Sequence, residues 1–171
     1  MFKRVRHRRL LLILCVVMLF CACHSKNVNF SVAIPKGWQV IDTVDEVRER
    51  LLRIYPPING SVPTFGENIV IGIIHSDNQQ NFVEDMTNRL KQEVNFYKET
   101  GKGVTRINSF NADWIQYLIQ INPQSDTAEQ KVYFIKSERY IFQIICSAKP
   151  NEIENISKEI DTVLNSFKVL H

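Results

Sequence analysis

The chain has 171 residues, of which 44% are hydrophobic, and this suits one domain with one core. Its formal net charge of +3 is typical of neither an acidic nor a strongly basic protein. Five of the 21 Lys and Arg residues lie before Cys23, whereas all 18 Asp and Glu residues lie after it. The rest of the chain therefore has a balance of −2 and charges of mixed sign, which argues against nucleic acid as a partner.

The N-terminal segment has the pattern of an export signal. Its basic residues precede an apolar run from Leu10 to Ala22. That run is too short to cross a bilayer as a helix and suits the hydrophobic region of a signal peptide. We therefore expect residues 1–22 to be a lipoprotein signal peptide, residues 23–29 a polar tether, and residues 30–171 a single domain.

The apolar run closes on Leu19-Phe20-Cys21-Ala22-Cys23, which resembles a bacterial lipobox. In a lipobox a small residue precedes a cysteine whose thiol receives diacylglycerol before the leader is cleaved. The resemblance implies that Cys23 is lipidated and that the protein reaches a membrane through its N-terminal lipid. Retention of the leader as an anchor is the alternative. The expected location is the bacterial cell envelope, with the domain in the periplasm.

The four cysteines predict no intramolecular disulfide. Cys15 and Cys21 leave with the leader, Cys23 receives the lipid, and only Cys146 stays as a thiol. Cys146 shares strand parity with apolar neighbours, which predicts a buried and inert thiol.

The first third of the domain predicts two strands, a helix and a loop. Alternation over 30–34 and 38–41, around the turn Pro35-Lys36-Gly37, predicts two strands with Trp38 pointing into the core. A capping-box pattern at Thr43 and apolar residues at helical spacing predict a helix up to Ile54. Residues 58–68 lack periodicity and predict a loop.

The remainder predicts a strand, a long helix, a run of strands and a closing helix. A continuous apolar run over 69–74 indicates a strand covered on both faces. The long helix is expected to be capped by Asp77 and to end near Gly101. The closing helix is expected to begin at Pro150 and to run to Phe167. Between them we expect four strands, at 104–108, 114–121, 130–136 and 140–147.

Consecutive hairpins between helices predict an α+β domain with a mostly antiparallel sheet. The strand at 114–121 places Ile115, Tyr117 and Ile119 on one face and Trp114, Gln116 and Leu118 on the other. The first face looks fully buried and the second partly covered. Helices are therefore expected on both faces of the sheet.

The opening Phe30-Ser31-Val32-Ala33-Ile34-Pro35-Lys36-Gly37-Trp38 is similar to that of PsbP-like and DcrB-like proteins of the Mog/PsbP-like superfamily. The predicted order of elements matches that superfamily along the whole of 30–171. The resemblance implies an α/β/α sandwich, with a mostly antiparallel sheet flanked by helices. It also implies a binding or accessory role without catalytic residues.

His75-Ser76-Asp77 is the one stretch that invites a catalytic interpretation. Adjacent residues at a strand end point to alternate sides, so these three cannot form a relay among themselves. His75 and Asp77 share a side but have no third ligand nearby, so a capping Asp beside a surface His is the preferred interpretation. We expect no catalytic residues, no metal and no cofactor.

Two non-enzymatic hypotheses follow, with a hydrolase-type enzyme a distant third. The first is an envelope-anchored lipoprotein that binds or supports another envelope protein. The second is a periplasmic carrier of a small apolar ligand. Four aromatic residues could line its ligand site, although we prefer to place them in the core or the sheet (Tyr97, Trp114, Tyr133, Tyr140).

The loop at 58–68 supplies the candidate partner contact, because Ile58, Val62 and Phe65 stand among Gly and Pro with no repeat to bury them together. The alternative is that these side chains tuck under the sheet edge as a small satellite cluster.

Overall fold

The computed structural model describes residues 29–43, 50–57, 66–75, 79–137 and 140–170. The predicted signal peptide and Cys23 lie outside the described residues. The elements, in chain order, are β1 (Asn29–Ser31), β2 (Gln39–Thr43), β3 (Leu51–Tyr55), β4 (Asn68–His75), α2 (Phe82–Glu93), β5 (Phe96–Ile107), β6 (Phe110–Gln120), β7 (Ala128–Ser137), β8 (Tyr140–Ala148), the 3-10 turn Ile153–Ile156, α3 (Ser157–Ser166) and β9 (Lys168–Leu170).

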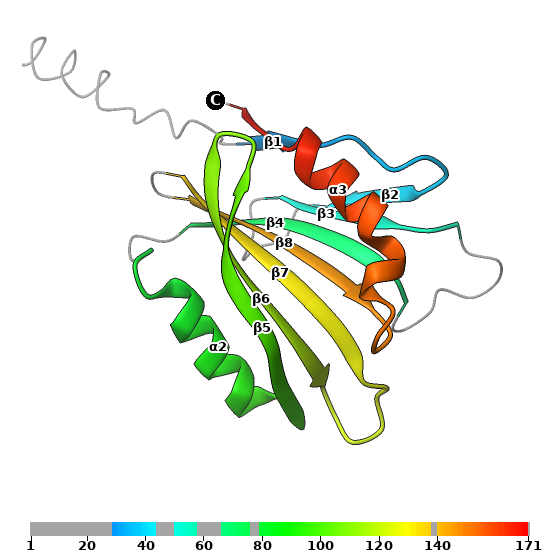
Figure 1. Ribbon diagram of the computed structural model, residues 1–171, viewed down its shortest axis with the longest axis vertical. Coiled ribbons are helices and arrows are strands. Elements are labelled where there is room, and N and C mark those ends of the chain that lie inside the picture. The colour runs from blue at the N-terminus through cyan, green and yellow to red at the C-terminus, as the bar shows by residue number, and fades with distance from the viewer. Residues whose placement is uncertain (1–28, 44–49, 58–65, 76–78, 138–139, 171) are drawn as a thin grey trace, which may run out of the picture.

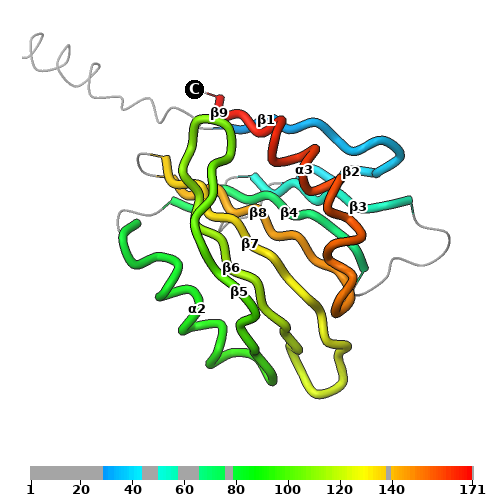
Figure 2. The backbone as a smooth tube through the Cα atoms, in the orientation of Figure 1, coloured from blue at the N-terminus to red at the C-terminus, as the bar shows by residue number. Residues whose placement is uncertain are grey.

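A seven-stranded antiparallel sheet forms the middle layer, in the order β2-β3-β4-β8-β7-β6-β5. Helix α2 packs on one face and α3 on the other, while β1 and β9 form a separate two-stranded sheet at one end (Figure 1). The tube in Figure 2 shows the tip of the β5–β6 hairpin reaching toward that same end. The predicted α+β class, with helices on both faces of a mostly antiparallel sheet, is confirmed.

The strands follow the hydrophobic pattern of the sequence. On β6, Ile115, Tyr117 and Ile119 are buried, whereas Trp114 and Gln116 are only partly buried, as the alternation predicts. The central strand β8 is apolar on both sides because it contributes side chains to the core cluster on each face of the sheet.

Aromatic side chains fill the core on the α3 side. The Phe30 ring lies 6.2 Å from Phe167 in a stacked arrangement and 6.3 Å from Phe142 edge to face. Phe142 and Phe167 are 5.3 Å apart and close the triangle. All three are fully buried, so β1, β8 and the end of α3 share one cluster.

The two strands predicted on either side of Pro35-Lys36-Gly37 do not pair with each other as a hairpin. β1 pairs with β9 and β2 pairs with β3, so the chain only turns between them. The turn itself is present: the Trp38 N–H donates to the Pro35 carbonyl at 3.0 Å, and Gly37 has φ of +84°. Burial of Phe30 beside α3 draws β1 away from β2. Trp38 packs against the core but is only partly buried.

The helix predicted from Thr43 to Ile54 is also wrong where the structure describes it. Thr43 ends β2, and Leu51–Tyr55 is β3. Leu52 and Ile54 are buried and Arg53 is exposed, which is the period of a strand. Leu51 and Ile54 have helical spacing and Leu52 and Ile54 have strand spacing, and pairing with β2 and β4 on either side decides for the strand. Residues 44–49 lie outside the described part.

The helix predicted to end near Gly101 ends at Glu93, and the chain continues as β5. Gly101 and Gly103 leave room for the Trp114 indole, since a Cβ on either would come within 3.3 Å of it. The strand pairing of β5 thus overrides the helical spacing. The last helix does not open at Pro150: a 3-10 turn begins at Ile153 and α3 follows from Ser157, and β9 was not predicted.

Truncation of the aromatic triangle should be costly. We expect Phe167→Ala to lower the free energy of unfolding by about 3 to 5 kcal/mol, because it leaves a cavity between α3 and the sheet. Trp38→Ala should cost less, since Trp38 is only partly buried. Urea unfolding followed by circular dichroism measures both. The matched control is Phe96→Ala at an exposed position, expected to change stability by about 0.5 kcal/mol or less. A loss at Phe167 no larger than at Phe96 would contradict the packing.

Candidate functional site

Several sequence-predicted candidates fall outside the described residues. These are the lipidation candidate Cys23, the loop residues Ile58, Val62 and Phe65, and Ser76 and Asp77. His75 is described: it sits at the exposed end of β4, with its ring edge-on to Tyr140 at 5.6 Å. Within the described ranges, no group of three or more His, Cys, Asp or Glu side chains is placed to hold a metal ion.

Cys146 is fully buried on β8, in the core beneath α3. Burial raises the pKa of its thiol to about 12. The thiolate is therefore scarce at neutral pH and shielded from solvent, as the prediction of an inert structural cysteine requires.

The four predicted sheet aromatics do not line one cavity. Tyr133 is buried on the α3 side, whereas Tyr97 packs with the α2 cluster at 5.1 Å from Tyr117. Trp114 is covered by the Lys131 ammonium, 5.0 Å from its ring centre. The structure thus places these aromatics on opposite faces of the sheet, where they pack as sheet residues.

The described site with the densest polar contacts lies where the domain begins. The Arg50 guanidinium donates to the Asp42 carboxylate from Nη2 at 2.6 Å and from Nε at 3.0 Å. Its Nη1 donates to the Asn29 side-chain oxygen at 2.7 Å and to the Phe30 carbonyl at 2.8 Å. The guanidinium also lies 4.7 Å from the centre of the Phe30 ring. One side chain thus ties β1 to β2, and we call this arrangement the Arg50 clamp.

Electrostatics favour the charged pair in the clamp. Hydrogen bonding to Arg50 lowers the pKa of the Asp42 carboxyl below its usual value, against a smaller opposing effect of burial. The same pairing raises the pKa of Arg50. A bidentate guanidinium–carboxylate contact has a fixed geometry, so it orients β1 as well as holding it.

A small groove adjoins the clamp. It has a volume of about 260 Å³ and runs between the chain after β1 and strands β2 and β3. Its walls are mostly apolar, and the clamp supplies the charged part (Phe30, Ser31, Val32, Ile34, Val40, Asp42, Arg50, Leu52). β2 is an edge strand of the large sheet, and its Val40 and Ile41 are each 46% exposed. The groove is therefore an open furrow beside a sheet edge.

Sequence reasoning missed the clamp because nothing in the local pattern marks Arg50. It lies in the stretch interpreted as a helix, and its partners are 8, 20 and 21 positions away. Asp42 is no clearer a signal, because it stands in a strand with two other polar residues, Gln39 and Thr43, whose five side chains are all exposed.

No protein-family model and no curated protein matches the chain. Solved structures do. LpqN, described as involved in cell envelope biogenesis of Mycobacterium tuberculosis, superposes with a TM-score of 0.59 at 14% identity, covering 86% of this chain and 88% of LpqN. Cyanobacterial PsbP (CyanoP) from Synechocystis gives a TM-score of 0.54 at 12% identity, covering 84% of this chain and 92% of CyanoP. The chain has the PsbP-like fold.

A third match is a Pseudomonas aeruginosa protein of unknown function, with a TM-score of 0.51 at 11% identity, covering 81% of this chain and 94% of that protein. At these identities the matches establish the PsbP-like fold, to which the resemblance of the Pro-Lys-Gly-Trp opening pointed, and nothing of the protein's activity. None of the helices that the structure describes is long and apolar enough to span a membrane.

The clamp should make stability depend on pH. A carboxyl whose pKa is lower in the folded than in the unfolded state stabilises the fold above about pH 4, and this is lost as pH falls through the folded pKa. Asp42→Asn should therefore be less stable than wild type at pH 7, by on the order of 1 kcal/mol or less for such a solvent-accessible pair. The gap should close at acid pH.

Urea unfolding of both proteins from neutral to acid pH measures this. Arg50→Lys is the matched control, because it keeps the charge but loses the two-pronged geometry, and we expect it to recover part of the loss relative to Arg50→Ala. A gap between wild type and Asp42→Asn that stays constant across the pH range would contradict the assignment.

Proposed function

We propose that this protein is an envelope-anchored lipoprotein whose PsbP-like domain has a non-catalytic binding or accessory role. The observation that carries the proposal is the lipobox-like Leu19-Phe20-Cys21-Ala22-Cys23, which ends only six residues before β1. A lipid on Cys23 would leave the domain outside the membrane and close to it. Two acyl chains of diacylglycerol are enough for stable residence, where one is not.

The comparison with LpqN supports the envelope location. LpqN is involved in cell envelope biogenesis, and its match covers 86% of this chain and 88% of LpqN. Fold likeness at 14% identity transfers no activity, so it supports the compartment only in combination with the N-terminal signal.

The described reactive groups favour binding over catalysis. The Cys146 thiol is buried and its raised pKa disfavours the nucleophilic thiolate. His75 is engaged edge-on with Tyr140 at the exposed end of a strand. An accessory role requires no catalytic chemistry from Cys146 or His75.

A carrier of a small apolar ligand is the second candidate, favoured by the apolar walls of the groove beside β2. Its volume of about 260 Å³ falls below the roughly 300 to 1,000 Å³ of small-molecule pockets. The groove is also open, so a ligand there would keep much of its surface in water. We therefore rank the carrier below a protein-binding role.

Lipidation is tested by metabolic labelling. Labelled palmitate should enter the wild-type protein, and Cys23→Ser should abolish both the label and the recovery of the protein with membranes, since the thiol is the acceptor. Cys146→Ser is the matched control and should keep the label, because that thiol is buried in the core. Label and membrane recovery that survive in Cys23→Ser would point to a retained leader as the anchor.

The partner contact is proposed for Ile58, Val62 and Phe65. Replacing 57–66 with a Gly-Ser linker of equal length should leave the melting temperature unchanged and abolish capture of the envelope partner, because the loop would present apolar side chains on a rigid scaffold. Cross-linking in cells followed by mass spectrometry identifies the partner and measures its capture. A lowered melting temperature with capture intact would show instead that these side chains only support the fold.

A further inference from the structure

We infer that the end of the domain formed by β1, β9 and the β5–β6 turn is a docking surface for an anionic lipid bilayer. The inference rests on the proposed lipid at Cys23 and deepens it, since it states which face meets the membrane.

The tether fixes the reach of the lipid. Six peptide units separate Cys23 from Asn29, and in any conformation they span no more than about 21 Å. β5 has 12 residues, so it extends about 40 Å between the two ends of the domain. The end that carries β1 is therefore held close to the bilayer, while the opposite end cannot approach it unless the domain tips over.

The attachment point is rigid. Asn29 is held by the Arg50 clamp at 2.7 Å, and Phe30 is buried between Phe142 and Phe167. The tip of the β5–β6 hairpin is fastened to the same end, because the Asn108 amide donates to the Phe167 carbonyl at 2.6 Å. Asn29, where the tether joins the domain, is therefore fixed relative to β1, β9 and the β5–β6 turn, and these elements move with it.

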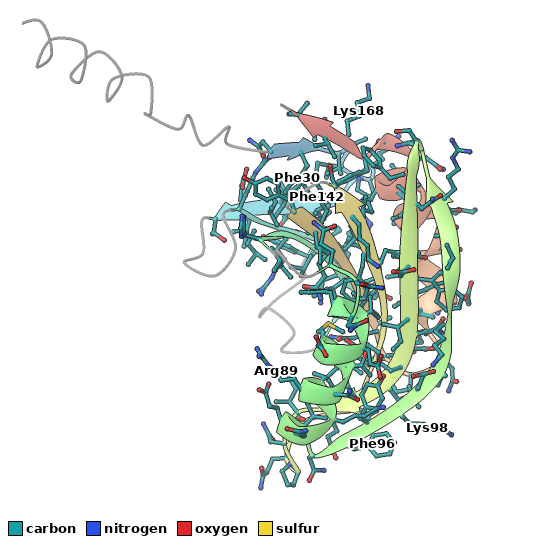
Figure 3. The ribbon with its side chains drawn as sticks, turned by 90° about the vertical axis from the view of Figure 1, so that its left-hand side faces the viewer. Phe30, Arg89, Phe96, Lys98, Phe142 and Lys168 are labelled. Atoms are coloured by element: carbon teal, nitrogen blue, oxygen red, sulfur yellow. The ribbon has the colours of Figure 1, made fainter. Side chains whose placement is uncertain are left out.

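The outer face of this end suits an anionic bilayer. The two-stranded sheet alternates, with Phe30 and Val169 facing the core and Asn29, Ser31, Lys168 and Leu170 exposed. Leu170 is 44% exposed and supplies an apolar contact. Figure 3 places Lys168 at this end and Phe96, Lys98 and Arg89 at the other.

Two cations at this end have no acidic partner among the described residues: Lys168 on β9 and Arg106 beside the hairpin turn. Arg106 donates to the Asn108 carbonyl, which keeps its guanidinium near the tip. The described acids toward this end are already paired, Asp42 with Arg50 and Asp113 with Lys136. Each unpaired cation near an anionic headgroup surface favours contact by about fivefold.

The test uses the processed, acylated protein in vesicles of phosphatidylethanolamine and phosphatidylglycerol that contain a spin-labelled lipid quencher. A fluorophore is attached to Leu170→Cys or, as the matched control, to Phe96→Cys, whose parent side chains are 44% and 41% exposed at opposite ends. Cys146 is buried and stays unlabelled. We expect quenching several-fold stronger at 170 than at 96.

Charge reversal separates contact from mere proximity. Lys168→Glu with Arg106→Glu should remove most of the excess quenching at 170, and phosphatidylcholine vesicles should do the same; if the double variant does not fold, the Gln pair replaces it. Vesicle flotation reports the anchor independently. Flotation with equal quenching at both positions, or with quenching indifferent to charge, overturns the docking surface alone. Failure of the acylated protein to float overturns the anchor, and the docking surface with it.

Discussion

The insertion of Phe30 into the core is the contact on which the arrangement of the domain depends. β1 and β9 have three residues each, and an isolated pair of strands is marginal at best in water. What holds them is the Phe30 side chain, which stacks on Phe167 and meets Phe142 edge to face. Burial of a Phe is worth about 1.5 to 3 kcal/mol, and each aromatic pair adds about 0.5 to 1.5 kcal/mol. The first and last strands of the fold are therefore held by one cluster.

Each face of the sheet has its own core cluster. The α3 side gathers β1, β3, β4 and β8 around Phe30 and Phe167, while the α2 side packs on β6 to β8. The central strand β8 belongs to both, so its one buried amide stands out. The Gln143 side-chain amide donates to the Met86 sulfur at 3.5 Å, and none of the residues that the structure describes donates to its oxygen. Burying this oxygen without a donor costs desolvation free energy, which the burial of the surrounding apolar side chains offsets.

The distance along the chain between paired strands decides which elements could be predicted from the sequence. The meander from β6 to β8 was predictable because alternation and short turns act locally, and each strand pairs with its neighbour in the chain. β3 was mistaken for a helix because Leu51 and Ile54 have helical spacing, whereas its buried pair Leu52 and Ile54 has the spacing of a strand, and only its pairing with β2 and β4 decides. The same holds for β1 and β9, which are joined across the whole length of the domain, and for Arg50, whose partners are brought to it by that pairing.

The clamp and the cluster together turn the start of the domain into a fixed point. Arg50 donates hydrogen bonds to Asn29 and Phe30, and the Phe30 ring packs against Phe142 and Phe167. β1 therefore cannot rotate without breaking the hydrogen bonds and the aromatic contacts. If Cys23 carries the lipid, the freedom between membrane and domain is confined to the six residues ahead of β1. Such a domain presents its β1–β9 end inward. The end that carries α2 and Phe96, about 40 Å away along β5, then faces the aqueous space. A partner in the envelope would meet that end or the sides of the sheet first.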